Sequence, residues 1–333
     1  MLAYIVRRLF NAIVTLLVVT AVTFAIFFAI PKATGSDPAL LYIGKQSDPA
    51  AIEGIRQKMG FDDPIVVQYG KFLKGIVAGR DYASGPDVTH CPAPCLGYSF
   101  ATDQEVTPLL LEDLPVTLSL ALGAAILWLI IGISFGVISA LRRGSFIDRA
   151  AMTTALAGVS LPVYFTGLLS SAIFVYWLQW LPQGQYVPFT ESPADWFTNL
   201  LLPWITLAFL FAATYARLTR ANMLETLGED YVRTARAKGL TERVVIGKHA
   251  LRSGLTPIVT VFGLDLGALL GGAVLTETVF NLRGLGYQAL TAIRQNDLPI
   301  ILGVTLIAAF FIVFANLIVD LVYGWIDPRV RLA

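Results

Sequence analysis

Few residues of this 333-residue chain are of types that could do chemistry. It has two histidines, His90 and His249, and two cysteines, Cys91 and Cys95. It contains no GxxxxGK[ST] phosphate-binding loop, no HExxH zinc motif and no GxSxG nucleophile elbow. Few side chains could therefore serve in acid–base, metal or nucleophilic catalysis. We expect a non-catalytic chain with no cofactor and no metal of its own.

The two cysteines are separated by three residues in the sequence CPAPC, directly after His90. In an oxidising compartment two thiols at this spacing could close a small disulfide loop, and the sequence favours that reading. Free thiols and a metal site are the alternatives. A metal site would take His90 as a third ligand, but no fourth ligand is near in sequence.

Two carboxylates fall in or beside apolar sequence. Asp265 stands alone among Phe262, Leu264 and Leu266, and Glu277 follows shortly after. A carboxylate is costly in lipid, so Asp265 should face a pore, a partner charge or another subunit. Both residues are candidates for a translocation pathway or a helix interface, and the sequence does not choose between these roles.

The composition predicts the elements that must carry these residues. Apolar and aromatic residues make up 56% of the chain, charged residues only 14%, and the mean hydropathy is +0.69. Soluble domains carry about 25% charged residues, so a soluble cytosolic enzyme is excluded. The net charge of +1 argues against a nucleic-acid binder.

Six runs are long and apolar enough to cross a bilayer, which needs about 20 helical residues. The third run contains Pro162, so we expect one tilted or bent span there. The sequence therefore predicts an all-α integral membrane protein with six transmembrane helices. The runs are Leu9 to Ile30, Val116 to Leu141, Ala150 to Trp180, Trp196 to Ala216, Leu255 to Thr276 and Leu298 to Val319.

Basic residues outside the spans predict the orientation. With a cytoplasmic amino terminus, fifteen Lys and Arg residues lie inside and two lie in the short outer loops. The first run is too long for a cleaved signal, so we expect a retained anchor. The predicted organisation is a cytoplasmic start and first helix (1–30), an extracytoplasmic segment (31–115), a five-helix core (116–323) with a cytoplasmic loop at 217–254, and a cytoplasmic tail (324–333).

The segment 31–115 should be partly helical. A helix is predicted from Pro49 to Gly60, and a second one is indicated by the spacing of Val66, Tyr69, Phe72 and Ile76 before Gly79. The stretch from Arg80 to Asp103 has no clear period, so we expect it to be irregular.

The cytoplasmic loop holds the most informative stretch, residues 228–259. Acidic residues open a short helix, basic residues close it, and Gly239 ends it, as the helix dipole favours. Thr241 can then cap a second helix that runs to Arg252. A solvated, positive-inside loop is the plainer interpretation of the composition.

This stretch resembles the cytoplasmic loop of binding-protein-dependent ABC importer permeases. RTARAKG followed by HALR is similar to the dipeptide and oligopeptide branch, although Arg233 and Thr234 depart from the Glu-Ala that opens the superfamily's Glu-Ala-Ala pattern. Six further stretches resemble the same branch in the same order, whereas CPAPC does not belong to it. They are YIVRRLF, PIVVQYGKFL, PVTLSLAL, SLPVYFTGLL, GALLGGAVLTETVFNLRGLG and DPRVRL.

The resemblance implies a type I ABC importer permease fold and ATP-driven import of di- or oligopeptides across the cytoplasmic membrane. It implies a second homologous permease, two ABC ATPase subunits that bind ATP and Mg, an extracytoplasmic substrate-binding protein or lipoprotein, and surrounding membrane lipid. The implied ATPase-coupling residues are Tyr231, Arg233, Thr234, Ala235, Ala237, Lys238 and Gly239.

Other functions stay open at this point. Importers of nickel, glutathione, haem or another small solute share the sequence pattern. A gradient-driven secondary transporter is a further alternative, but it would usually show internal repeats or more intramembrane carboxylates. A membrane enzyme is disfavoured because the chain lacks a polar catalytic cluster.

Overall fold

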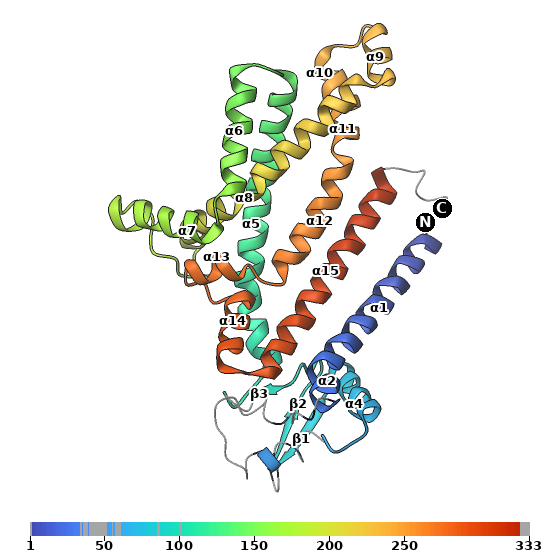
Figure 1. The fold of residues 1–333 in the computed structure, drawn as a ribbon, viewed down its shortest axis with the longest axis vertical. Coiled ribbons are helices and arrows are strands. Elements are labelled where there is room, and N and C mark those ends of the chain that lie inside the picture. Colours follow the sequence, from blue (N-terminus) through green and yellow to red (C-terminus); the bar gives the residue numbers. More distant parts are fainter. Residues whose placement is uncertain are drawn as a thin grey trace. The chain divides into compact units, whose positions relative to one another are not determined.

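The structure is a computed structural model that describes residues 2–33, 35, 39, 52–54, 56, 61–84, 87–99 and 102–326. Its described residues are mostly helical and group into two units (Figure 1). Unit 1 contains Met1–Thr117, Leu270–Val274 and Arg283–Phe314. Unit 2 contains Leu118–Leu269, Leu275–Leu282 and Ala315–Ala333.

Unit 1 begins with a long apolar helix. α1 (Leu2–Phe24) continues through a π-helical turn, η1 (Ala25–Ala29), into α2 (Ile30–Ala33). The ring of Phe24 stacks on Phe28 at 4.6 Å and lies 5.8 Å from Phe72 of α4 (Ile65–Ala78). The helix predicted from the spacing of Val66 to Ile76 is therefore confirmed. The helix predicted from Pro49 to Gly60 lies largely outside the described residues.

Two small hairpins follow α4, so the expectation of an irregular stretch from Arg80 to Asp103 was wrong. β1 (Arg80–Ser84) pairs antiparallel with β2 (Asp87–Cys91), and β3 (Tyr98–Ser99) with β4 (Gln104–Glu105). Neither Arg80–Ser84 nor Asp87–Cys91 alternates strictly between apolar and polar residues, and β3 and β4 have only two residues each, so no alternating pattern predicts these strands. Pairing within the fold, rather than periodicity, specifies these strands.

The rest of unit 1 packs around the start of a second long helix. Val106 and Leu110, at the start of α5 (Val106–Leu141), are fully buried against Leu285 of α14 (Leu285–Gln295) and Ile300 of α15 (Leu298–Ile326). α5 begins ten residues before the predicted run and contains Pro115. The sequence could not show this extension, because the added turns include charged residues.

A buried carboxylate joins two elements of unit 1. Asp297 precedes α15, accepts a hydrogen bond from Ser99 Oγ, and accepts a second from Ile300 N at 3.4 Å. Burial raises the pKa of this carboxyl above its usual range, although both hydrogen bonds act in the opposite direction. The contact fixes the β3 hairpin to the start of α15.

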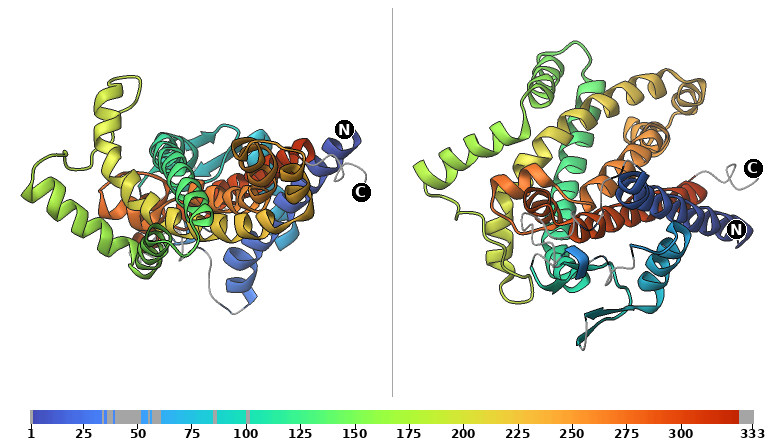
Figure 2. Two further views of the ribbon diagram at one scale, coloured as in Figure 1. Left: turned by 90° about the horizontal axis from the view of Figure 1, so that it is seen from above. Right: turned by 60° about the horizontal axis from the view of Figure 1, so that its bottom comes forward.

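Unit 2 is a bundle around α8 (Pro193–Gly228). The neighbours of α8 include α6 (Phe146–Ser160) and the part of α5 that follows Thr117. Glycines allow close approach: a Cβ on Gly123 would lie 2.1 Å from the Trp204 ring. α6 packs on α8 (Figure 2), where a Cβ on Gly158 would lie 3.0 Å from Ala213. α8 runs on to Gly228, so the first twelve residues of the predicted cytoplasmic loop 217–254 continue the helix.

Among the described residues, four helices are long and apolar enough to cross a membrane, or six if each of two bent pairs is one span. The four are Ile5–Lys32, Val106–Leu141, Pro193–Gly228 and Leu298–Val322. The pairs are Phe146–Ser160 with Val163–Trp177 and Glu242–Gly254 with Thr256–Leu270, bent by 100° and 49°.

The bend predicted in the third run is present but sharper than a tilt. α6 ends at Ser160, Leu161 is extended, and α7 (Val163–Ser171) starts after Pro162 and leads into η3 (Ala172–Trp177). A proline disfavours the helical conformation of the residue before it, which explains the break. The fifth run is not one helix to Thr276 either: α12 (Thr256–Leu270) ends before Gly272, whose φ is +125°, and α13 (Val274–Val279) follows.

Candidate functional site: the α9 hairpin

A short hairpin follows α8 in unit 2. Glu229 is extended and turns the chain into α9 (Asp230–Ala237), and Lys238 is the C-cap of this helix. Gly239 has a φ of +76°, and a Cβ there would meet nothing within 4 Å. Glycine is therefore favoured at this position by the backbone conformation and not by lack of space. The helix end predicted at this glycine is confirmed.

The returning arm consists of α10 (Glu242–Val244), the π-helical η4 (Val245–Ala250) and α11 (Leu251–Gly254). The predicted second helix is present, although Thr241 makes no side-chain capping hydrogen bond. Arg236 joins the two arms, because its Nε and Nη2 donate to the Glu242 carboxylate at 2.8 and 3.4 Å.

One face of α9 packs on its own chain. Val232 and Ala235 lie with Val245 of η4 in a buried cluster, and Leu227 of α8 packs against it. Val232 and Val245 are fully buried. An eight-residue helix is unstable alone in water, so this cluster is what holds α9 in place.

The opposite face of α9 is exposed. Of the seven residues expected to couple, six are exposed and only Ala235 is buried. Tyr231 of α9 is 43% exposed, and Leu240, which follows Gly239, is 41% exposed. The Arg233 side chain pairs with Asp230 at 3.6 Å, rather than with Glu229. The exposed members are Tyr231, Arg233, Thr234, Ala237, Lys238 and Gly239.

Asp265 makes a contact between two helices of unit 2. Its Oδ2 accepts a hydrogen bond of 2.9 Å from the hydroxyl of Tyr215 on α8. Tyr215 is fully buried, and its ring lies 6.1 Å from that of Trp128 on α5. The Asp265 side chain itself is only partly buried. Sequence reasoning missed Tyr215, although a phenol in the fourth apolar run was a visible signal.

Glu277 is fully buried in α13. Its backbone carbonyl accepts from Leu282 N at 2.9 Å, which closes the turn after the helix. The side chain lies inside the chain and does not reach its surface in this conformation.

A charged contact that the sequence did not suggest fixes the start of α6. Asp148 is buried and accepts hydrogen bonds from Arg220 Nε at 2.7 Å, Arg220 Nη2 at 3.0 Å, Gly144 N at 2.8 Å and Ser139 Oγ. This network joins the α5–α6 turn to α8. Arg220 follows the fourth apolar run and lies seventy-two residues from Asp148, so no local pattern predicts the pairing.

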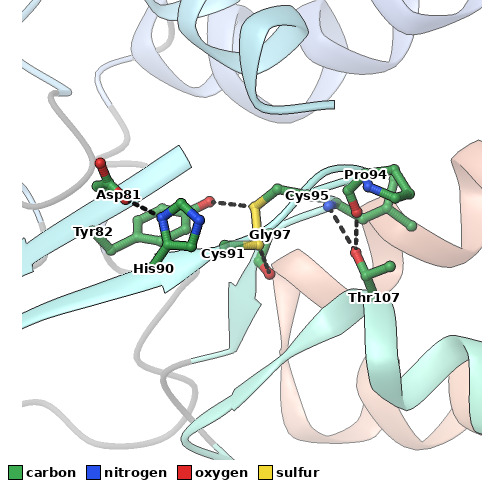
Figure 3. Close-up of a disulfide and its surroundings, with 9 residues drawn as sticks. Asp81, Tyr82, His90, Cys91, Pro94, Cys95, Gly97 and Thr107 are labelled. Atoms are coloured by element: carbon green, nitrogen blue, oxygen red, sulfur yellow. Dashed lines mark hydrogen bonds and ion pairs between the residues drawn. A yellow bond between two sulfur atoms is a disulfide. The ribbon is translucent and has the colours of Figure 1, made fainter. Parts of the chain in front are cut away.

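Cys91 and Cys95 form a disulfide in unit 1 (Figure 3), which is the pairing that the sequence favoured. Both residues are buried. The bridged loop is tied to two helices: Cys95 N donates to Gly75 O of α4 at 3.1 Å, and Thr107 Oγ1 of α5 donates to Pro94 O at 2.6 Å. His90 points away to Asp81.

These features define a helical integral membrane protein with an exposed hairpin in unit 2. Among the described residues no group of three His, Cys, Asp or Glu side chains could hold a metal ion. The chain matches a family described as "Binding-protein-dependent transport system inner membrane component" over residues 132–332, and that family's N-terminal part over residues 1–121.

Relatives match over the whole length. The chain is 38% identical to the dipeptide transport system permease protein DppB of Alkalihalophilus pseudofirmus, covering 99% of this chain and 100% of the relative. It is 36% identical to the glutathione transport system permease protein GsiC of Pectobacterium atrosepticum, covering 99% of both chains. The chain therefore belongs to the binding-protein-dependent transport system inner membrane components, and it is an ATP-driven importer permease of the type I ABC fold.

Proposed function

We propose that this chain forms part of the membrane pathway of an importer for short peptides. The observation that carries the proposal is the 38% sequence identity, over the full length of both chains, to a permease named for dipeptide transport. A second homologous permease completes the pathway, and an extracytoplasmic substrate-binding protein or lipoprotein delivers the peptide. Two partner ATPases bind ATP and Mg and supply the energy.

The exposed face of α9 is the surface that docks on an ATPase. Exposed Tyr231 and Leu240 beside the basic Arg233 and Lys238 give it an aromatic, apolar and cationic character that suits a protein contact. Its buried face transmits the force, because Val232 and Ala235 seat α9 on η4 and α8. Motion of the ATPase then moves α8 and α12 as rigid elements.

The distribution of basic residues supports an orientation with α9 and both chain termini in the cytoplasm and the segment 31–115 on the outer side. The α5–α6 turn, which carries Arg142 and Arg143, lies at the same end of unit 2 as α9 (Figure 1). The region 116–323 forms the permease core in this proposal. In this proposal Asp265 lines the pathway while it accepts the hydrogen bond from Tyr215, and the buried Glu277 belongs to a helix interface.

Cross-linking tests the coupling surface. The native cysteines are bonded to each other, so a substituted cysteine is the only free thiol among the described residues. Ala237→Cys is exposed and should cross-link to the ATPase in membranes that contain the whole transporter. Ala235→Cys, two residues away on the same helix but buried, should not. Equal yields from both positions, or labelling of Ala237→Cys from outside intact cells, would refute the proposal.

Transport assays test the energy source and the cargo. Proteoliposomes that hold the full complex and binding protein should take up a labelled dipeptide only when ATP is supplied on the α9 side. Uptake driven by a proton gradient without ATPases would refute ATP coupling. The identity to a glutathione permease makes glutathione a second candidate cargo. Competition by glutathione but not by dipeptides would favour it.

A further inference from the structure

Unit 2 carries an apolar groove that the other described residues of this unit leave open. The groove lies between α5, α6 and α8 and has a volume of about 350 Å³, within the range of about 300 to 1,000 Å³ typical of ligand pockets. Of its twelve lining residues only Thr154 has a polar side chain. Phe146 is 85% exposed and Phe135 51%, so the groove opens outward. All three helices belong to apolar spans or bent spans, so its surroundings are lipid or protein.

Positive charge gathers at one end of this groove. Arg142 and Arg143 lie in the turn before Phe146, and Arg149 precedes the lining residue Ala150. All three arginines are exposed, and none forms an ion pair within the described part of the chain. Asp148, the acidic residue beside them, is already bound by Arg220. This end of the groove is therefore cationic, because Asp148 neutralises Arg220 and not the three exposed arginines.

The basic turn is also held in a fixed shape. Gly144 has a φ of +78° and donates its N–H to Asp148 at 2.8 Å, while Ser145 Oγ caps the Asp148 N–H at 3.2 Å. A turn fixed in this way presents its arginines without first losing backbone freedom, which favours binding. Basic pockets between membrane helices are suited to lipid phosphates.

We propose that this groove binds an anionic phospholipid of the surrounding bilayer. An acyl chain lies along Phe135, Phe146 and Ala213, and the phosphate is held by Arg142, Arg143 and Arg149. The proposal goes beyond peptide transport and does not depend on it. The orientation proposed above places the site in the cytoplasmic leaflet, where anionic lipid is attracted to basic residues.

Native mass spectrometry of the purified transporter tests the site. Complexes exchanged into mixed micelles with phosphatidylglycerol should retain this lipid in preference to phosphatidylcholine. Arg142→Gln with Arg143→Gln should weaken retention about thirty-fold, from roughly five-fold per basic residue near a lipid surface. The matched control is Arg7→Gln with Arg8→Gln, another adjacent pair next to an apolar run, which belongs to unit 1 and does not line the groove. Equal losses from both pairs would overturn the proposal.

The groove itself is tested by neighbouring threonines of α6. Thr154 and Thr153 are both exposed, but only Thr154 lines the groove. Thr154→Phe should displace the lipid, and Thr153→Phe should not. A photoreactive phenylalanine analogue at position 146 should cross-link to lipid in membranes. A cross-link to the sister permease instead would show that protein covers the groove and would overturn the proposal.

Discussion

The buried cluster that holds α9 allows a quantitative prediction for the substitution Val245→Ala. Val245 is fully buried against Val232 and Ala235. The substitution removes two buried carbons, which costs about 1.5 kcal/mol at about 0.8 kcal/mol each. That free energy corresponds to roughly a tenfold larger population of molecules in which α9 is detached from this cluster.

Hydrogen–deuterium exchange of the complete transporter measures that population. Amides of α9 exchange when the helix opens, so their exchange in Val245→Ala should be about tenfold faster. ATP-driven uptake should fall as well, because an unseated α9 passes less motion to α8. ATPase activity should fall less than uptake, since the partner subunits retain their own site.

Val244→Ala is the matched control. It removes the same two carbons from the adjacent position, but Val244 is 39% exposed and lies outside the buried cluster. Its α9 exchange should stay close to that of the unmodified chain. The prediction fails if the α9 amides exchange at the same rate in the two variants, or if Val245→Ala changes neither amide exchange nor uptake. Either result would show that the buried Val245 side chain does not hold α9 in place.

Two further predictions concern stability. Gly123→Ala places a Cβ 2.1 Å from the Trp204 ring and should lower the free energy of unfolding by about 1–3 kcal/mol, seen as a lower melting temperature of the complex. Gly70→Ala, where the added Cβ meets nothing within 4 Å, should leave the melting temperature unchanged. Equal melting temperatures of the two variants would contradict the close packing of α5 on α8. Replacing both Cys91 and Cys95 with serine should cost roughly 2 kcal/mol for a loop of this length, and the melting temperature of this variant should no longer respond to reductant. Unchanged melting of the double variant would show that the bridge does not stabilise unit 1.

Much of this protein could be predicted from local sequence. Long uncharged runs predict helices wherever they occur, because backbone groups in lipid must be paired within the helix. The α9 hairpin was also predictable, since Gly239 and the charges around it act within a few residues. The cysteine pairing followed in the same way from a spacing of four.

Other features depend on residues that are far apart in the chain. The β1–β2 hairpin forms because its strands pair with each other, although neither has a readable pattern. Pro162 indicated a bend, but the angle of 100° is seen only in the tertiary structure, where α6 and α7 both pack on α8. The burial of Ala235 could be seen only once η4 was placed beside α9.

The charged contacts show the difference most clearly. Sequence alone established that Asp265 is a costly residue in an apolar run, because the cost follows from composition. Only the tertiary structure supplied its partner Tyr215, fifty residues away, and joined Asp148 to Arg220 across seventy-two residues. Helix formation is local and readable from neighbours, whereas the partner of a buried polar group is decided by which helices pack together.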